Sequence, residues 1–371
     1  MQFDVQPLVE VDLHVTNRCS LRCTHCCFES GTLAMEEMTV AEMQKLLDEL
    51  SCLGIREVHI TGGEPLVRNS ILAILDSATN RGFHVRLQTN GVHLNPKLVQ
   101  TLKQSGVNSI MISVDGYGVD HETIRGVGTF RRTMDGVACA KAGGLFVRVN
   151  SVVHRDNMAG MLRLLEETCG MRVDVHSFFY YTPHGRGVHT TLKEVPGPIW
   201  LAFLESLKHH WTKIGVPVGT QVVAEQAFVA QNAWNPMLHG CKIASPDYAQ
   251  IMCDGRVVPC TMFIVTPYSL GNVRQHSLEE VWSSQEHWKT FESIRTAGHG
   301  DSAAFEPTGC WAYLAGQNRP AARDPRWQIA QGTVPICPIV KCNVILGTTG
   351  PSTEDVISRS ANRSEGPSGK S

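Results

Sequence analysis

Three cysteines near the start of the chain constrain its fold and chemistry more than any other feature. Cys19, Cys23 and Cys26 are separated by three and then two residues, and they follow an apolar stretch, residues 11–16, that is typical of a β-strand. Three thiols on a loop that leaves a strand can bind one face of a small iron–sulfur cube, whose fourth iron then has no protein ligand. The alternatives are a loop of reduced thiols or a structural zinc site, which needs a fourth close ligand. The two nearby candidates for that fourth ligand are His25 and Cys27.

The length and composition indicate a globular chain with one large α/β domain and a smaller second one. Of its 371 residues, 42% are hydrophobic and 18% are charged, which is ordinary for a protein with a real core. The net charge of −2 gives no electrostatic reason to expect nucleic acid or an anionic membrane as a partner. Because no stretch resembles a membrane span or a signal peptide, we expect a cytoplasmic protein.

Thirteen cysteines do not indicate a disulfide framework in such a protein, since the cytosol keeps thiols reduced. They point instead to metal binding or catalysis. The sixteen histidines are scattered, and none is assigned as a metal ligand. Three further cysteines fall in or beside predicted helices and are expected to pack there: Cys52, Cys139 and Cys169.

Strand and helix patterns alternate about every 15 residues through the first half of the chain, which predicts a parallel sheet with helices outside it. The predicted strands are residues 11–16, 57–61, 85–89, 109–114, 145–153 and 173–181. The polar motifs follow the carboxyl ends of these strands. We therefore predict a partial (β/α)6 TIM-like barrel with its site at that mouth, followed by a small C-terminal α+β domain.

The second strand ends in Gly62, Gly63, Glu64 and Pro65. Two glycines remove side chains where the backbone leaves the strand, so that it can approach a ligand closely, and the next residue presents a carboxylate. A simple glycine–proline turn is the alternative. Ser113 and Asp115 close the fourth strand, and Asn150 lies in the fifth. Together these groups are enough to hold an amino acid head and a ribose.

These motifs, in this order, resemble the radical S-adenosylmethionine (SAM) superfamily over residues 12–181. The resemblance implies that Cys19, Cys23 and Cys26 ligate a [4Fe–4S] cluster whose fourth iron is chelated by SAM. Reductive cleavage of SAM would then give a 5′-deoxyadenosyl radical that abstracts a hydrogen atom from the substrate, and a reducing partner such as flavodoxin or ferredoxin would supply the electron.

The resemblance also implies which residues contact SAM. Gly62, Gly63, Glu64 and Pro65 would receive its amino group, and Ser113, Asp115 and Asn150 would lie near its ribose or carboxylate. His25 stands where the family often has an aromatic residue near the adenine, and Cys27 is interpreted as a packed thiol. After the sixth strand, Arg186 is interpreted either as a ligand of a carboxylate of SAM or the substrate or as a solvated turn residue.

The C-terminal third contains a second set of cysteines. Asp254-Gly255 between two apolar runs predicts a hairpin turn shortly before Cys260. Together with Cys241, Cys310 and the motif at residues 270–272, this hairpin resembles the auxiliary-cluster extension called SPASM, or its shorter form, twitch, over residues 241–316. The resemblance implies an auxiliary iron–sulfur cluster held by Cys241, Cys260 and Cys310.

The sequence departs from the full SPASM pattern, because other residues stand where further cysteines are expected. We therefore predict one auxiliary cluster, and a zinc site built from the same thiols is the alternative. The substituting residues are Pro307, Tyr313, Gly316 and Pro320. The candidates for a fourth ligand are Cys253, Cys337 and Cys342.

The predicted organisation is a radical SAM barrel at residues 1–190, a helical connector at 191–239, an auxiliary-cluster domain at 240–345 and a disordered tail at 346–371. The predicted function is radical SAM chemistry in maturation of a peptide, a protein, or a peptide- or tetrapyrrole-derived cofactor. Since few residues precede the first strand, a peptide leader would need a separate partner protein. Oxidation or rearrangement of a small metabolite of the aminocyclitol or sugar type is an alternative, and a non-catalytic zinc protein is a more distant one.

Overall fold

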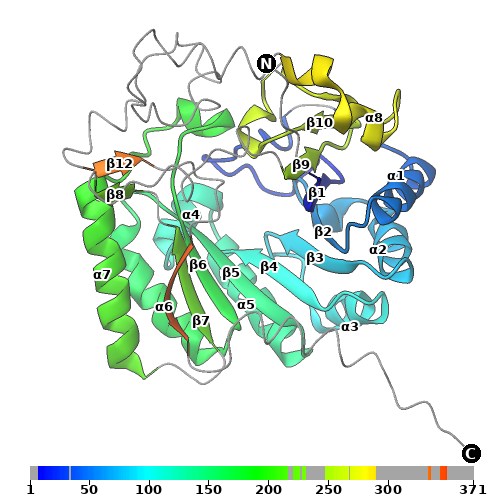
Figure 1. Ribbon diagram of the computed structural model, residues 1–371. Helices are drawn as coiled ribbons and strands as arrows, with labels where there is room; N and C mark the ends of the chain where they lie inside the picture. The colour runs from blue at the N-terminus through cyan, green and yellow to red at the C-terminus, as the bar shows by residue number, and fades with distance from the viewer. Residues whose placement is uncertain are drawn as a thin grey trace, which may run out of the picture.

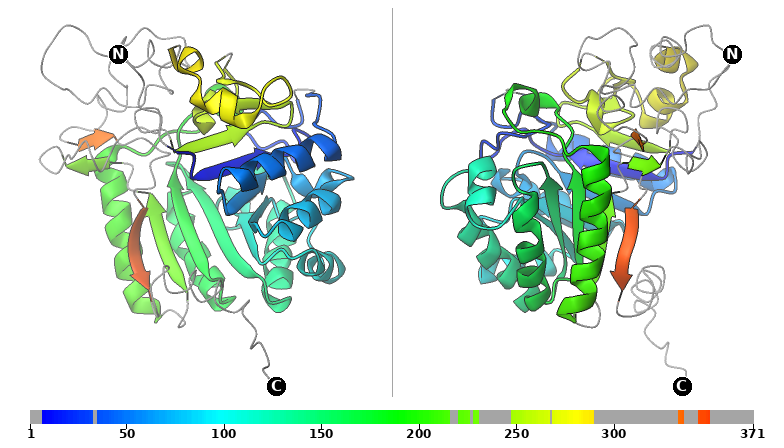
Figure 2. Two further views of the ribbon diagram at one scale, coloured as in Figure 1. Left: turned by 45° about the vertical axis from the view of Figure 1, so that its right-hand side comes forward. Right: turned by 90° about the vertical axis from the view of Figure 1, so that its left-hand side faces the viewer.

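A curved sheet with helices along its outer face forms the body of the molecule (Figures 1 and 2). The computed structural model describes residues 7–32, 35–215, 220–225, 228–230, 247–266, 268–289, 333–335 and 343–348. Strands β1 to β7 lie in chain order in this sheet, and each is parallel to the next. Their bounds are Glu10–His14, Glu57–Thr61, His84–Thr89, Ser109–Ser113, Phe146–Val153, Val175–Tyr180 and Gln221–Glu225. This is the partial TIM-like barrel predicted from the alternation of elements.

The helices α1 to α7 connect or cover these strands, while α8 follows β11 and lies against α1, and sequence signals mark several helix ends. Thr39 and Glu42 form a capping box at the start of α1, as Thr39 at this position predicts. Asn95 caps α3 through its side chain, and Pro96 occupies the first turn. The bounds of α1 to α8 are Val40–Cys52, Ile71–Asn80, Pro96–Gln104, Val119–Arg125, Thr129–Ala142, Met161–Gly170, Gly197–Ile214 and Leu278–Ser283.

Two elements of the barrel were not predicted. Helix α4, Val119–Arg125, is seven residues long and lies between glycines at both ends, so it is too short for a clear helical period. Strand β7, Gln221–Glu225, lies within the region predicted as a helical connector and pairs in parallel with β6. The connector therefore contains both the long helix α7, Gly197–Ile214, and a seventh strand of the sheet.

The two faces of the sheet differ in polarity, as β5 illustrates. Val147, Val149 and Val153 on one face are fully buried, while Arg148 and Asn150 on the other face are half-buried. Because side chains alternate along a strand, the apolar set packs under the outer helices and the polar set faces the inside of the barrel. The inner face is thus available for polar chemistry.

The C-terminal part continues the same sheet. Strand β9, Tyr248–Ile251, pairs in parallel with β1, so that Leu13 is opposite Ile251. The predicted turn at Asp254-Gly255 is present, because β9 pairs antiparallel with β10, Arg256–Val258, and Gly255 has a φ of 88°. The full strand order is β11-β10-β9-β1-β2-β3-β4-β5-β6-β7-β13, and β8 and β12 form a separate pair. The remaining bounds are β8 Phe228–Ala230, β11 Gly271–Asn272, β12 Thr333–Pro335 and β13 Asn343–Thr348.

None of the helices within the described ranges has both the length and the apolar content needed to cross a lipid bilayer.

Candidate iron–sulfur and SAM site

The loop that carries the three N-terminal cysteines follows β1 at the carboxyl end of the barrel strands. Its backbone is held by a bond within the loop, from Gly31 N to Asn17 O at 2.8 Å, and by one from Thr24 N to Ile124 O of α4 at 2.9 Å. Cys23 is buried, and Cys19 and Cys26 are half-buried. The loop therefore has a defined structure and lies at the mouth of the barrel, the carboxyl ends of its strands, as the sequence predicts.

The three thiols do not form a compact group of metal ligands in the structure. Among the described residues, only Glu10, Glu57 and His59 form a group of potential ligands whose atoms all lie within 4.8 Å of one another. Thiolates on one tetrahedral zinc lie about 3.8 Å apart, since a Zn–S bond is about 2.3 Å long. An iron–sulfur cluster offers a separate iron to each sulfur and needs no such compact group. The same holds for the wider set of these three cysteines, His25 and Cys27. Among these five described residues, no three have ligand atoms that all lie within 4.8 Å of one another.

The thiols lie in a poorly solvated environment. Burial raises the pKa of Cys19 to about 11, and the neighbouring Cys23 and Cys26 contribute to the rise. Burial also raises the pKa of Cys23, which the charge of Arg125 partly offsets. Binding of iron would replace the protons on these sulfurs. Three thiols on one loop, one buried and two half-buried, are a suitable donor set for an iron–sulfur cluster.

The glycine pair at the end of β2 packs against the cysteine loop. A Cβ at Gly63 would lie 2.3 Å from Arg18 O, and one at Gly62 would lie 2.6 Å from Thr16 O. Gly63 N donates to Thr16 O at 2.7 Å. The glycine pair therefore permits a close approach to the backbone of the cysteine loop, and the predicted approach to a ligand stays a prediction.

Glu64 and Pro65 follow this glycine pair, and the Glu64 carboxylate is used within the protein. Fully buried, it accepts hydrogen bonds from Thr89 Oγ1 at 2.7 Å, Asn90 N at 2.7 Å and Leu66 N at 3.1 Å. Burial raises the pKa of Glu64, against the lowering effect of these bonds. Glu64 thus joins the end of β2 to the end of β3, while Pro65 begins a short 3-10 turn, Pro65–Val67.

Asp115, after β4, is also fully buried and engaged. Its Oδ2 lies 2.8 Å from His25 Nε2 and 2.5 Å from Arg125 Nε, and its Oδ1 accepts from Val152 N at 2.8 Å. Burial alone would raise the pKa of Asp115, but Arg125 and His25 hold it well below its usual range. The structure thus connects two predicted site residues, Asp115 and His25, directly to each other.

Arg125 is a site residue that the sequence analysis missed. It ends α4, its side chain is 10% exposed, and its Nη1 lies 3.9 Å from Cys23 Sγ. It was missed because helix α4, which carries it, was not predicted. The signal available in the sequence was an arginine directly before Gly126-Val127-Gly128, shortly after the Ser113 to Gly116 motif.

Ser113 and Asn150 lie side by side on β4 and β5, because their Cα atoms are register partners. Asn150 Oδ1 is buried and has no hydrogen-bond partner among the residues that the structure describes. Ser177 is the register partner of Asn150 on β6, and its buried hydroxyl likewise has no hydrogen-bond partner among the described residues. Unsatisfied buried polar groups are costly. This wall of the barrel therefore offers an acceptor and a hydroxyl to a polar ligand.

Arg186 makes a contact within the protein that neither of its two interpretations predicted. Its Nη2 donates to Ser30 O at 2.7 Å, and its backbone N donates to Cys26 O at 3.0 Å. Gly185 packs so closely that a Cβ there would lie 2.5 Å from Cys27 O. The segment after β6 therefore supports the cysteine loop from a second side, and Cys27 is half-buried beneath it.

The group formed by Glu10, Glu57 and His59 lies on the inner face of the barrel and is an ion-pair network. His59 Nδ1 lies 3.0 Å from Asp12 Oδ1, and its Nε2 lies 3.0 Å from Glu57 Oε1. Burial would lower the pKa of His59, but Asp12 and Glu57 raise it to about 9. Arg86 pairs with Glu57 at 2.8 Å. The carboxylates of Asp12 and Glu57 are therefore paired with protonated His59 and with Arg86.

Of the C-terminal cysteines, the structure describes Cys253 and Cys260, and both are buried. Cys253 contacts Met35, with 3.6 Å between the sulfur atoms, and burial raises its pKa to about 12. Cys260 directly follows the hairpin. The other predicted ligands of this set lie outside the described residues: Cys241, Cys310, Cys337 and Cys342.

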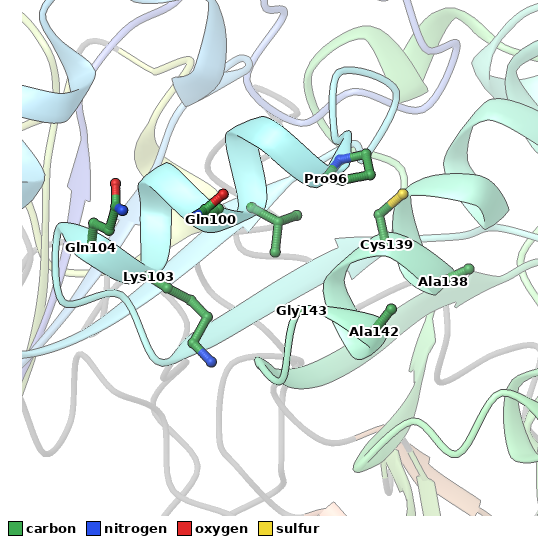
Figure 3. Close-up of a pocket in the computed structure, with 9 residues that line it drawn as sticks. Pro96, Gln100, Lys103, Gln104, Ala138, Cys139, Ala142 and Gly143 are labelled. Carbon is green, nitrogen blue, oxygen red and sulfur yellow. The ribbon is translucent and has the colours of Figure 1, made fainter.

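The three cysteines assigned to packing differ from one another. Cys169 is buried, as predicted, and Cys139 is half-buried. Cys52 is exposed, so its assignment to packing was wrong; it is the last residue of α1, whose buried residues are Met43, Leu46, Leu47 and Leu50. Cys139 lines a groove of about 720 Å³ between α3 and α5 (Figure 3). None of the predicted ligands of the cluster or of SAM lines this groove.

Comparison with known proteins assigns this site to a family. Residues 13–167 match the model of the radical SAM superfamily, and residues 241–308 match the SPASM iron–sulfur cluster-binding domain. The AdoMet-dependent heme synthase of Methanosarcina barkeri is 26% identical over 73% of this chain and 81% of its own. The PqqA peptide cyclase of Granulibacter bethesdensis is 25% identical over 75% of each chain.

A solved structure shares the fold. Streptococcus suis SuiB bound to S-adenosylmethionine superposes with a TM-score of 0.72 and 17% identity, over 88% of this chain and 78% of that one. SuiB bound to the precursor peptide SuiA gives the same TM-score. The cofactors are therefore a [4Fe–4S] cluster and SAM for the barrel and an auxiliary iron–sulfur cluster for the SPASM domain. The chain is an enzyme of the radical SAM superfamily that carries a SPASM domain.

Proposed function

We propose that Cys19, Cys23 and Cys26 hold the [4Fe–4S] cluster that cleaves SAM. The observation that carries this proposal is their shared loop at the barrel mouth, whose backbone is hydrogen-bonded to α4 and to the segment after β6. When bound, the cluster supplies one electron to the sulfonium of SAM, which yields a 5′-deoxyadenosyl radical. The protein fixes the loop from three sides, through the glycine pair, α4 and the segment at Arg186.

SAM would lie along the carboxyl ends of β2, β4 and β5. The backbone at Gly62, Gly63 and Pro65 is proposed to receive its amino group, and Ser113 and Asn150 to face its ribose or carboxylate. The unpartnered Asn150 Oδ1 supports this. For Glu64 and Asp115 we propose an indirect part, since their carboxylates are fully engaged within the protein. They would position the backbone and side chains that contact SAM.

The proposed reaction is hydrogen abstraction from a peptide, in the maturation of a peptide or protein. Peptide-directed relatives support this: a protein named PqqA peptide cyclase matches three quarters of the chain, and SuiB, which has the same fold, binds a precursor peptide. A second candidate is modification of a tetrapyrrole precursor, because two relatives are named AdoMet-dependent heme synthase. No comparison of this strength favours a small sugar-like metabolite.

We propose that Cys241, Cys260 and Cys310 hold the auxiliary cluster. The candidates for its fourth ligand are Cys253, Cys337 and Cys342. It would accept an electron from the substrate radical or bind the substrate. We further propose the domain division at residues 190, 239 and 345 given above, and a flavodoxin or ferredoxin as reductant. The cytoplasm is the proposed location, because the many cysteines need a reducing compartment.

Anaerobic reconstitution with iron and sulfide tests this function. The protein should bind about seven or eight irons per chain, as expected for two four-iron clusters, and release 5′-deoxyadenosine from SAM under dithionite. With a short peptide encoded beside its gene, the peptide mass should change, while a heme precursor should remain intact. Conversion of the heme precursor alone would select the second candidate. A protein that holds zinc and cleaves no SAM would contradict both.

A further inference from the structure

A buried ion pair lies directly beside one of the three N-terminal cysteines. Arg125 Nε lies 2.5 Å from Asp115 Oδ2, and Arg125 Nη1 lies 3.9 Å from Cys23 Sγ. The two side chains of the pair are 10% and 0% exposed, respectively. A cation so close to a sulfur and so poorly solvated acts strongly on its charge, since electrostatic interactions strengthen as the local dielectric falls.

The guanidinium has little freedom to leave this position. Asp115 is itself held by His25 Nε2 at 2.8 Å and by Val152 N at 2.8 Å, and its backbone carbonyl accepts from Asn157 Nδ2 at 3.1 Å. Arg125 Nε is hydrogen-bonded to Asp115. Because the guanidinium group is planar, this bond fixes its orientation, in which Nη1 points toward Cys23. The geometry is that of a fixed N–H donor aimed at a sulfur ligand, supported by a carboxylate behind it.

We propose that Arg125, oriented by Asp115, raises the reduction potential of the [4Fe–4S] cluster through its contact with Cys23. The inference rests on the proposed assignment of Cys19, Cys23 and Cys26 as ligands. One-electron reduction adds one negative charge to the cluster, and hydrogen bonds and charges near the sulfurs set the potential at which this happens. Arg125 stabilises the reduced form, and the negative charge of Asp115 moderates its effect. Both are positioning residues.

A purely structural role is the alternative, because the same ion pair also ties the cysteine loop to α4. The two roles differ in sign. If the pair only holds the loop, Arg125→Gln and Asp115→Asn should both loosen it and change the cluster in the same direction. If the pair sets the potential, loss of the cation should lower the potential and loss of the anion should raise it.

The experiment is a titration of the reconstituted full-length protein with titanium(III) citrate, with and without SAM. The electron paramagnetic resonance signal that changes on addition of SAM reports the midpoint potential of this cluster, and iron content reports its assembly. Arg186→Gln is the matched control: the Arg186 side chain supports the same loop through Ser30 O and has no hydrogen bond to a thiol in the described part of the chain, so this variant should keep the wild-type potential. We expect a lower potential for Arg125→Gln and a higher one for Asp115→Asn.

The proposal is overturned if the potentials of both variants equal that of the wild type, if they move together, or if Arg186→Gln shifts as far as Arg125→Gln. Arg125→Lys covers the case in which Arg125→Gln assembles no cluster. With its charge retained, it should load iron and keep a potential close to that of the wild type. Failure of both Arg125 variants to load, with normal loading of Arg186→Gln, would assign Arg125 to assembly alone and overturn the proposal. A wild-type protein that binds iron at other cysteines would instead contradict the ligand assignment.

Discussion

Single residues decide how tightly the cysteine loop is held. The glycine pair brings the end of β2 into backbone contact with the loop, Gly185 does the same from the segment after β6, and both contacts leave no space for a Cβ. Close packing of this kind transmits any displacement. A change of one methyl group at these positions is therefore expected to alter the spacing of the thiols.

Gly63→Ala is the clearest test of this contact. Its Cβ would lie 2.3 Å from Arg18 O, so the loop must move, and we expect a loss of about 1–3 kcal/mol in the free energy of unfolding. Chemical denaturation and iron content after reconstitution check both consequences. Gly170→Ala is the control, since a Cβ at this position of α6 meets nothing within 4 Å. Wild-type iron content in Gly63→Ala would show that the loop tolerates the shift.

The network around His59 predicts a dependence of stability on pH. The pKa of His59 is raised from 6.5 to about 9 in the folded protein, so the folded state retains a proton that the unfolded state loses. The stabilisation is fully present below about pH 6.5 and is lost as the pH rises through 9. Urea unfolding of the apoprotein at pH 6, 7.5 and 9.5 should show this decline, and His59→Gln should flatten it. An equal slope in the variant would refute the assignment to His59.

The sequence revealed the residue types at the strand ends but not the directions of their side chains. Gly62 and Gly63 were predicted to let the backbone approach a ligand, and the close approach in the structure is to the backbone of the cysteine loop. Glu64 and Asp115 are expected near SAM, which stays a prediction, but the bonds of their carboxylates to Thr89, Asn90, His25 and Arg125 were not predicted. The partner of a buried carboxylate depends on tertiary contacts between distant segments, which a spacing pattern does not contain.

At the scale of elements, the hairpin region is joined to α1 by polar contacts. Arg274, after β11, lies 3.0 Å from Glu42 Oε1 through its Nε and donates through Nη2 to Glu37 O at 3.1 Å. Leu278 N, at the start of α8, donates to Glu49 Oε2 at 2.7 Å. Strands and helices with strong periods were predicted to within a few residues, whereas these connections depend on charges more than 200 residues apart in the chain.

Arg274→Gln should therefore loosen the hairpin before it affects the barrel. We expect faster amide hydrogen exchange in β9, β10 and β11 and little change in β2 to β5, because the lost contacts join only the former to α1. Mass-spectrometric exchange on the full-length protein measures this. Arg81→Gln is the control, as it removes an ion pair with the largely exposed Asp48, a type worth about 0–1 kcal/mol. Uniform exchange changes in Arg274→Gln would contradict a local effect.

At the scale of the whole molecule, the two cysteine sets are assigned different tasks, and their removal should have different effects. Replacement of Cys19, Cys23 and Cys26 by alanine should abolish SAM cleavage. Replacement of Cys241, Cys260 and Cys310 should lower the iron content by about four per chain, as for one four-iron cluster, and leave 5′-deoxyadenosine formation without product. Chromatographic assay of 5′-deoxyadenosine and mass spectrometry of the substrate separate the two results. Full product formation in the second variant would refute the auxiliary role.

The pairing of β9 with β1 has a practical consequence for such experiments. A partial barrel leaves its first strand with unpaired backbone groups, and an open strand of this kind invites association with other chains. Here β9 occupies that side of β1, as Figure 1 shows. A chain shortened before residue 247 would expose β1 directly beside the cysteine loop, and its self-association would be mistaken for loss of a cofactor. Substitution of single cysteines in the full-length chain keeps β9 paired with β1.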